Sequence, residues 1–476
     1  MLEVKQMLEL LPNLNSDSKI PLYIQIYNYV KNEILSGNIP HNSKLPSIRS
    51  FAKDLMLSKN TIEAAYEQLL AEGYVKSKNR SGLYVTRIEG GFKNINENLQ
   101  SSSISIEKPT DCNIKVRYDF SSGQIDLTTF PYSQFRKIVG RSIDEFSSEL
   151  LLYGDHQGDY GLRHEIAKYI HHSRGVVCSP EQIVISSGTQ QSLTLLCHML
   201  LHNHKHAAFE EPSYLGAKAV FKHFNLDIYP IKLDMDGINI EELYKSLAKV
   251  VYVTPSHQYP YGMVMSISKR LRLLKWADEN NGIIIEDDYD GEFRFKGKPI
   301  PSLQGLDNSN RVIYLGSFSK SLMPSMRISY LVLPKSFLNI YEKNYKIYEQ
   351  PVPRLLQKSL EIFIKEGYWE KHLRKAKILY KKKQELLLNS LAEYFKENIT
   401  IIGADSGLHI LLQIHTKMNE YELIERALNA GIKVDSTSVN WMNPRANSLP
   451  VIFIGFAGIK IEDIPCAIKI LSECWF

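Results

Sequence analysis

The chain has 476 residues, of which 44% are apolar and 23% are charged, and its formal net charge at pH 7 is +5. This length predicts two or more domains, and the composition is typical of a folded protein rather than a disordered one. The small net charge excludes a chain that is basic throughout, although one basic module can still lie within it.

No targeting, membrane or metal signal accompanies this composition. The first residues lack the basic region and cleavage site of a signal peptide, and no apolar run approaches the ~18 residues of a membrane-spanning helix. The five cysteines are scattered without a C-x-x-C pair, which favours a reducing compartment and gives no metal-binding signature. We therefore expect a cytoplasmic protein with no metal site and no membrane contact.

Residues 18–87 form the first predicted domain, which has the pattern of a helix-turn-helix followed by a hairpin. Two helices are expected at about 47–56 and 58–72, and the break between them is very short. Ser58 is expected to cap the second helix. The next stretch, YVKSKNRSGLYV, has apolar ends around a polar centre that contains Gly82, which predicts a β-hairpin wing.

The charge of this domain indicates DNA binding. Residues 44–87 carry eight Lys or Arg side chains against four Asp or Glu side chains, and the basic excess lies at the start of the second helix and in the hairpin. DNA-binding proteins use such side chains to hold backbone phosphates. Lys59, Asn60 and Thr61, in the first turn of the second helix, can reach base edges in the major groove. The alternative is a helical protein-docking domain with a solvated basic face.

The residues of this domain also match a family. The domain resembles the winged helix of GntR-type repressors in four successive motifs, LPSIR, SKNT, AYEQLLAEGY and SGLYV. The resemblance covers nearly the whole domain and implies binding to double-stranded promoter DNA. It further implies that the following residues contact DNA: Arg49, Ser58, Lys59, Thr61, Arg80 and Gly82.

The rest of the chain divides into a linker and a larger domain. Residues 88–117 are rich in Asn, Ser and Gly, which predicts a flexible linker. Residues 118–476 alternate short β-rich runs with helical stretches, which predicts an α/β domain with a parallel sheet covered by helices. After about residue 345 the helices lengthen and shorter strands follow, which predicts a small C-terminal α+β subdomain.

One lysine in the larger domain has unusual neighbours. The stretch YLGSFSKSLMPSMRISY sets Lys320 among small hydroxyl-bearing residues, with Arg327 seven residues later. A lysine attacks carbonyl groups only when its amine is neutral, which requires a site that lowers its pKa. A cofactor with an aldehyde, a phosphate and a pyridine ring would account for this setting. Ser317 and Ser319 offer hydroxyls, and Arg327 offers a fork for a phosphate.

Two segments further upstream complete this pattern. In ISSGTQQSL a strand runs into a helix, so that Ser187, Gly188, Thr189 and Gln190 are expected to present backbone N–H groups to a phosphate. In GIIIEDDYDGEF a buried strand ends in carboxylates. Asp287 is our choice for the partner of a protonated pyridine nitrogen, with Tyr289 expected near the phenolic oxygen of the ring. Each element alone is common in loops and strand ends, whereas their order and spacing together indicate a cofactor site.

This order resembles the fold-type-I pyridoxal-phosphate enzymes of the aminotransferase class, over most of residues 118–476. The resemblance implies pyridoxal 5'-phosphate as the cofactor and Lys320 as the residue that forms a Schiff base with it. It implies that Tyr214, in EEPSY, stacks on the ring, although a core tyrosine is the alternative. YGDHQGDYG looks like the dimer-interface segment of these enzymes, in which Tyr153 reaches the cofactor phosphate of the partner subunit of a homodimer.

A winged helix joined to an aminotransferase-like domain is the layout of the MocR/GabR regulators, and TPSHQYPYG and EDDYDGEFRF also look like that subfamily. The implied function is a transcriptional regulator that senses an amine effector, or pyridoxal phosphate itself, at Lys320. In metabolic aminotransferases an Asn commonly holds the position of Tyr259, so this departure argues against efficient transamination. The alternatives are an active aminotransferase with an accessory DNA-binding domain and a cofactor-free scaffold.

The effector is less defined by the sequence. Family members can carry arginines for a substrate carboxylate at the positions that we align with Gly216 and Val439, and neither is an arginine here. These differences argue against a simple ω-amino acid. His257 and Arg445 are the candidate effector contacts, and a solvated loop arginine is the alternative for Arg445.

Overall fold

A computed structural model of the chain describes residues 14–15, 18–79, 81–88, 116–201, 204–295, 297, 299–443 and 448–476. The chain divides into two compact units, Met1–Cys112 and Asn113–Phe476, and each is described by itself. Three sequence predictions lie outside the described residues, namely Arg80, Arg445 and the linker at positions 89–115. Within the described ranges, no helix is both long enough and apolar enough to cross a membrane.

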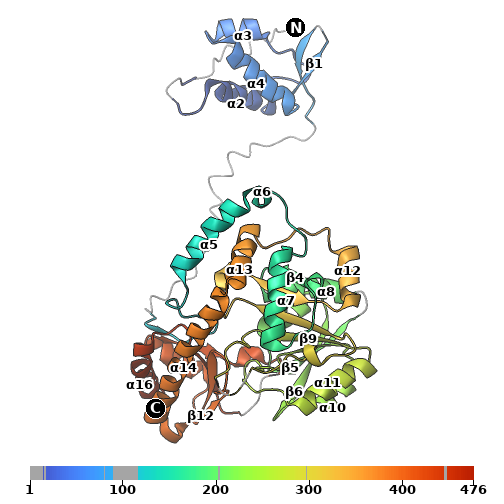
Figure 1. Ribbon diagram of the computed structural model, residues 1–476. Coiled ribbons are helices and arrows are strands. Elements are labelled where there is room, and N and C mark those ends of the chain that lie inside the picture. Colours follow the sequence, from blue (N-terminus) through green and yellow to red (C-terminus); the bar gives the residue numbers. More distant parts are fainter. Residues whose placement is uncertain are drawn as a thin grey trace. The chain divides into compact units, whose positions relative to one another are not determined.

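The first unit is a winged helix, which confirms the fold predicted for it. Its elements are α2 (Leu22–Leu35), α3 (Ile48–Asp54), α4 (Lys59–Ala71), β1 (Val75–Lys78) and β2 (Gly82–Val85) (Figure 1). Only residues 55–58 separate α3 from α4. β1 and β2 pair as an antiparallel hairpin, with Val75 opposite Val85. Both of these valines are buried in the same core as Ile26 of α2 and Leu69 of α4, so the hairpin is anchored on the helices.

The second unit is built on an eight-stranded sheet with the order β4-β11-β10-β9-β8-β5-β6-β7. Its strands are β4 (Ile183–Ser186), β5 (His206–Glu211), β6 (Asp227–Asp234), β7 (Gly237–Ile238), β8 (Val250–Val253), β9 (Ile283–Asp288), β10 (Val312–Ser317) and β11 (Ser329–Val332). The central strands are parallel, as expected, but β11 is antiparallel to β10 and β4, and β7 is antiparallel to β6. The sheet is therefore mixed, because the connection 318–328 is shorter than the crossover of about a dozen residues that parallel strands need.

Helices cover both faces of this sheet (Figure 1). They are α5 (Tyr132–Glu145), α7 (Tyr160–Arg174), α8 (Thr189–Leu200), α9 (Leu215–His223), α10 (Ile240–Lys245), α11 (Ile267–Glu279), α12 (Lys335–Asn344) and α13 (Arg354–Lys365). The short helix α6 (Ser147–Leu150) follows α5 and has no buried residue. Ile183 and Ile185 of β4 pack in the core with α5, α7 and α13, whereas Val184 packs in the core with α8, α9 and α12. This alternation is the period of a strand that is buried on both faces.

The C-terminal subdomain contains a four-stranded sheet with the order β12-β13-β16-β15. Its elements are α14 (Tyr368–Phe395), β12 (Ile399–Ile402), β13 (His409–Ile414), α15 (Glu420–Asn429), β14 (Ile432–Lys433), β15 (Asp435–Ser436), β16 (Val451–Gly455) and α16 (Ile464–Trp475). The first strand of the second unit, β3 (Tyr118–Asp119), pairs in parallel with β14. The beginning of this unit is therefore held by its C-terminal subdomain.

Candidate cofactor site

A cavity of about 320 Å³ opens beside the ends of the strands β8, β9 and β10. The carboxyl ends of parallel strands are the usual place for a ligand in an α/β sheet. Most of the residues that the sequence assigned to the cofactor line this cavity: Thr189, Gln190, Tyr214, Asp287, Tyr289, Ser317, Ser319, Lys320 and Arg327. Segments far apart in the chain thus meet in one place.

Lys320 lies in the connection between β10 and β11 and lines the cavity. Burial lowers the pKa of Lys320, while the attraction of Asp290 and Asp435 acts in the opposite direction. A lowered pKa leaves more of the amine neutral, which is the form that attacks an aldehyde. The setting of Lys320 therefore suits a lysine that bonds covalently to a carbonyl carbon.

Asp287 lies on β9, and one of its oxygens has no partner. The Tyr252 hydroxyl donates to Oδ2 over 2.5 Å, whereas Oδ1 is buried and accepts no hydrogen bond in the described structure. Burial raises the pKa of Asp287 to about 7, and the nearby charges of Asp288 and Asp290 act in the same direction. A protonated ring nitrogen placed at Oδ1 would supply both the missing donor and the missing positive charge. This oxygen fits the pyridinium of pyridoxal phosphate.

The other carboxylates of the EDDYDGE stretch have partners of their own. Glu286 accepts from the backbone N–H groups that open the turn 303–304. Asp288 accepts hydrogen bonds from Arg174 and Tyr314. Asp290 accepts from His257, and Glu292 accepts from Tyr169. Each of these other carboxylates therefore has its own hydrogen-bond donors. Among the acidic side chains of this stretch, only Asp287 has a buried oxygen without a partner in the described residues.

The start of α8 and Arg327 form a cradle for a phosphate. Gly188 has φ 100°, and a Cβ there would lie 1.9 Å from Nη2 of Arg327, so the arginine lies directly against this glycine. Arg327 Nη2 also donates to the carbonyl oxygen of Ser187 over 3.3 Å. A guanidinium at the N-terminus of a helix is a strong site for an anion.

Only part of the predicted set of N–H groups is available in this cradle. The N–H of Ser187 donates to Gln191 Oε1, and the N–H of Gly188 donates to Ser329 Oγ. Thr189 and Gln190 remain, and both line the cavity. Nearby, the hydroxyl of Ser317 contacts the hydroxyl of Ser319 over 3.0 Å.

Aromatic side chains form one wall of the cavity. Tyr214 and Tyr259 meet edge to face with ring centroids 6.0 Å apart, and Tyr259 meets Tyr289 in the same way at 5.6 Å. A Cβ on Gly216 would lie 2.5 Å from the Tyr214 ring, so a larger side chain at position 216 conflicts with the present position of this ring. His257 does not line the cavity but lies behind Tyr289, with Nδ1 at 2.8 Å from the Tyr289 hydroxyl.

Several lining residues were missed in the sequence, since they come from distant segments. They are residues 121–124, which follow β3, and Leu408, His409 and Phe453 of the C-terminal subdomain. Burial and the neighbouring His257 lower the pKa of His409 to about 3, so its ring is neutral. Val439, which we aligned with a carboxylate-binding arginine, is 51% exposed and does not line the cavity. No periodic or motif signal in the sequence marks these residues.

Tyr153 lies outside the cavity, on an exposed segment before α7. Leu151, Leu152 and Tyr153 are 87%, 68% and 86% exposed. Three adjacent apolar or aromatic side chains in water are unusual on a protein surface unless another surface covers them.

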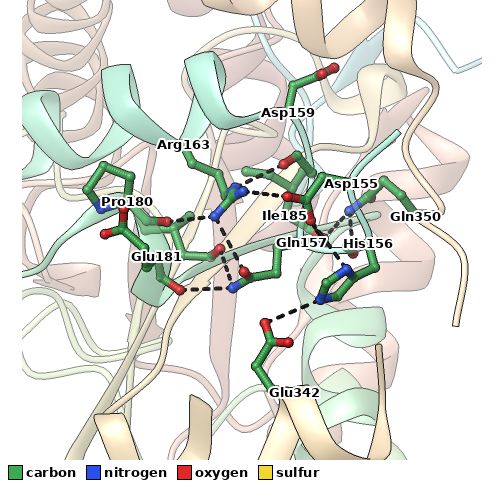
Figure 2. A network of polar contacts seen from close by, with 12 residues as sticks. Asp155, His156, Gln157, Asp159, Arg163, Pro180, Glu181, Ile185, Glu342 and Gln350 are labelled. Carbon is green, nitrogen blue, oxygen red and sulfur yellow. Dashed lines mark hydrogen bonds and ion pairs between the residues drawn. The ribbon is translucent and has the colours of Figure 1, made fainter. Parts of the chain in front are cut away.

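The loop after Tyr153 is fixed in place by a polar network (Figure 2). The buried guanidinium of Arg163 donates to Asp155 Oδ2 over 2.9 Å, to the Gly158 carbonyl over 2.9 Å and to the Pro180 carbonyl over 3.1 Å. The Gln157 amide donates to backbone carbonyl oxygens at the start of β4. The exposed segment is therefore tied to the strand that leads into the phosphate cradle.

In the winged helix, the predicted base-reading residues lie at the start of α4. Lys59 and Asn60 are exposed, as is Arg49 on α3. The hydroxyl of Ser58 caps α4 by accepting from the Thr61 N–H over 3.2 Å, and the two hydroxyls are 2.7 Å apart. Ser58 and Thr61 thus shape the end of the helix that presents Lys59 and Asn60.

The hairpin adds a second group of basic side chains. Gly82 opens β2 with φ 109°, and a Cβ there would lie 3.1 Å from Cε of Lys44. Nζ of Lys78 lies 4.3 Å from the centre of the Tyr84 ring. Lys78 therefore lies on the hairpin, and Lys44, which precedes α3, packs against it.

Comparisons with known proteins agree with both units. Residues 22–85 match the gntR family of bacterial regulatory proteins, and residues 118–440 match the class I and II aminotransferases. The chain is 41% identical to the HTH-type transcriptional regulator YdeL of Bacillus subtilis, over 98% of this chain and 100% of that protein. It is 33% identical to the probable rhizopine catabolism regulatory protein MocR of Rhizobium meliloti, over 97% of this chain and 95% of that protein.

Solved structures give the same result for the larger unit. The crystal structure of an archaeal alanine:glyoxylate aminotransferase matches with a TM-score of 0.69 and 25% identity, over 75% of this chain and 90% of that one. A kynurenine aminotransferase of Pyrococcus horikoshii matches with a TM-score of 0.67 and 25% identity, over 80% and 96%. The larger unit is an aminotransferase-type domain that binds pyridoxal phosphate. The chain belongs to the MocR/GabR subfamily of GntR-family transcriptional regulators, in which a DNA-binding winged helix is fused to such a domain.

Proposed function

We propose that this regulator adjusts its DNA binding according to what is bonded at Lys320, which is either an amine effector or pyridoxal phosphate alone. One observation carries the proposal. Lys320, whose pKa is lowered, and Asp287, which has a buried oxygen without a partner, line the same cavity. When bound there, pyridoxal phosphate supplies an aldehyde and an electron-accepting ring.

Different residues of the cavity would bind different parts of this cofactor. The Lys320 amine would hold the aldehyde carbon, and Asp287 Oδ1 would keep the ring nitrogen protonated. Arg327, with the N–H groups of Thr189 and Gln190, would hold the phosphate. Tyr214, Tyr289, Ser317 and Ser319 complete the wall around it.

An amine effector would act on the chain by replacing the Lys320 amine at the aldehyde carbon. Lys320 would then be a free side chain in the connection between β10 and β11. The protein responds only if its two arrangements bind the effector unequally, so the released lysine must favour one of them. DNA affinity changes by the ratio of the two effector affinities and by no more.

The aminotransferase alternative requires repeated turnover with a keto acid. Tyr259 stands where metabolic aminotransferases commonly carry an Asn, and it packs against both Tyr214 and Tyr289. The cations that line the cavity in the described residues are Lys320 and Arg327, and Arg327 belongs to the phosphate cradle. These features support sensing over turnover, and they support an effector other than a simple ω-amino acid. His257, behind Tyr289, is then an indirect effector contact, and Arg445 stays a candidate contact.

We also propose that the protein works as a homodimer on two DNA half-sites. The exposed segment of Leu151, Leu152 and Tyr153 would be covered by a second copy, where Tyr153 would reach the partner's cofactor phosphate. Each copy would place its α4 in the major groove, with Arg49, Lys59, Asn60 and the Gly82 hairpin as contacts and Ser58 and Thr61 at the helix start. Arg80 is the remaining candidate contact. A cytoplasmic location would give such a dimer access to chromosomal DNA.

Visible absorption of the purified protein tests the role of Lys320. The wild-type protein should be yellow with pyridoxal phosphate and should lose that colour irreversibly with borohydride, and tryptic peptides should then carry the label on Lys320. Label on another lysine, or none, would refute the assignment. Steady turnover in a screen of amines and keto acids would favour the aminotransferase alternative, whereas half-reactions alone would favour the regulator.

A further inference from the structure

A second and much smaller cavity shares Asp290 with the cofactor cavity. Its volume is about 10 Å³. Its polar lining comes from four segments: Arg174 at the end of α7, Ser256 and His257 after β8, Asp290 and Arg294 after β9, and Ser406 just before β13. The small cavity therefore lies where the large sheet meets the C-terminal subdomain.

Buried polar atoms without partners gather around this small cavity. Within the described ranges, no hydrogen bond reaches Oγ of Ser256, Nε2 of His257, Nε and Nη1 of Arg294, or Oγ of Ser406. Ser256, His257 and Ser406 are only 6%, 4% and 4% exposed. Buried polar groups in folded proteins nearly always have a partner, so this many in one space indicates a small bound molecule.

The proton on the His257 ring determines which hydrogen bonds the bound molecule must donate and accept. Nδ1 of His257 lies 2.9 Å from Asp290 Oδ2 and 2.8 Å from the Tyr289 hydroxyl. An ionised carboxylate only accepts hydrogen bonds, so Nδ1 carries a proton. With the ring neutral, Nε2 has a lone pair and needs a donor. Arg294 presents N–H groups that need an acceptor.

We propose that the small cavity binds one water molecule, which accepts from Arg294 and donates to Nε2 of His257. A volume of about 10 Å³ corresponds to one water, and a water with two to four polar partners is stable in such a place. The hydroxyls of Ser256 and Ser406 supply its remaining partners. A halide ion would match the Arg294 N–H groups, but it cannot donate to a lone pair on Nε2.

This water gives Arg294 and Ser406 a role as positioning residues for Tyr289. Asp290 holds the imidazole proton on Nδ1, and the water at Nε2 fixes the orientation of the ring, so the Tyr289 oxygen accepts from Nδ1. The hydroxyl proton of Tyr289 must then find another acceptor, and Tyr289 lines the cofactor cavity. The proton of Tyr289 is thereby directed toward the bound ligand.

The C-terminal subdomain lies directly on this arrangement. A Cβ on Gly407 would lie 2.1 Å from Cε1 of His257 and 2.8 Å from Oδ2 of Asp290. A shift of the loop that carries Ser406 and Gly407 would therefore open the water site and disturb the His257 ring. The site is a property of the folded domain and does not depend on which effector binds.

Electron density tests the site itself. The full chain is crystallised with bromide in place of chloride, and anomalous data are collected at the bromine edge. We expect a single peak within hydrogen-bond distance of His257 Nε2 and Arg294, without anomalous signal. An anomalous peak would show a halide and overturn the water, and an empty cavity would overturn the site.

Substitution of Arg294 tests the positioning role. Arg294→Met removes both N–H donors, whereas Arg294→Gln keeps an N–H donor. Nitrogen NMR of histidine-labelled, cofactor-free protein reports which ring nitrogen of His257 is protonated. We expect the resonance of the unprotonated Nε2 to have the shift of a hydrogen-bonded nitrogen in the wild type and in Arg294→Gln, and to move to that of a free lone pair in Arg294→Met. An unchanged Nε2 resonance in Arg294→Met would refute the positioning role. If Arg294→Met does not fold, Ser406→Ala replaces it with the same expectation.

Discussion

Gly188 and Arg327 lie in direct contact: a methyl group on Gly188 would be 1.9 Å from the guanidinium. The glycine also has φ 100°, where a side chain is strained. We therefore expect Gly188→Ala to displace Arg327 and to weaken pyridoxal phosphate binding by about tenfold or more, since a charge-assisted hydrogen bond contributes about 1.5–3 kcal/mol. Absorption titration of the stripped protein measures this affinity.

Gly175→Ala is the matched control for this prediction. Gly175 also has a positive φ, 67°, but a Cβ there meets no atom within 4 Å. It should lower the free energy of unfolding by about 1 kcal/mol through backbone strain and leave cofactor affinity unchanged. Equal losses of affinity in both variants would contradict the cradle.

Asp287 and Asp288 are neighbours with opposite roles. Asp287→Asn should weaken pyridoxal phosphate binding roughly ten- to a hundredfold, because the ring nitrogen loses a charged acceptor. Asp288→Asn should instead lower the free energy of unfolding by about 3–5 kcal/mol, because Asp288 is the buried partner of Arg174 at 2.6 Å. Paired titrations and melting curves separate the two effects, and a reversed pattern would mean that the wrong carboxylate was assigned to the ring.

The raised pKa of Asp287 predicts how the cofactor-free protein responds to pH. Its value of about 7 in the folded state exceeds the ~3.9 of an unfolded aspartate, so folding favours the protonated form. The associated stability is fully present below about pH 4 and is lost as pH rises through about 7. The melting temperature of Asp287→Asn should therefore fall less than that of the wild type between about pH 5 and pH 8. Parallel curves for the two proteins would show that Asp287 is not buried as described.

We expect the exposed segment before α7 to lie in a dimer interface, and we expect charged side chains introduced there to dissociate the dimer. Leu151 and Leu152, each replaced by Glu, would place four carboxylates in the proposed interface, and we expect a monomer by light scattering. Met235→Glu is the control, since Met235 is 96% exposed but lies far along the sheet, in the turn between β6 and β7. A double variant that remains dimeric would move the interface elsewhere.

Lys59, exposed at the start of α4, should contribute a phosphate contact. Lys59→Ala should weaken promoter binding and reduce the slope of log affinity against log salt by about 0.9. Lys222→Ala, an exposed lysine on α9, should change neither quantity. Fluorescence anisotropy at several salt concentrations gives both values, and an unchanged slope for Lys59→Ala would exclude it from the DNA contact.

The sequence predicted the parts of this fold that depend on local pattern. The short break before Ser58 predicted the helix-turn-helix. The segments expected at the cofactor site were predicted from the order of Gly188, Asp287, Lys320 and Arg327, because each of these residues lies at or near the end of a regular element. The antiparallel direction of β11 was not predicted, since the sequence pattern indicated a parallel sheet. The contributions of His409 and Phe453 were not predictable, since they depend on how the C-terminal subdomain packs. The hydrogen bonds that occupy the N–H groups of Ser187 and Gly188 likewise arise only in the folded structure.

The most direct test measures promoter DNA affinity of wild type and Lys320→Ala by anisotropy, with pyridoxal phosphate removed, with it restored, and then with a panel of amines. We predict that the affinity of the wild type changes with the cofactor or with an amine, and that Lys320→Ala binds the same DNA with one affinity throughout. If both proteins respond alike, or if neither binds the promoter in a salt-dependent way, Lys320 does not control DNA binding.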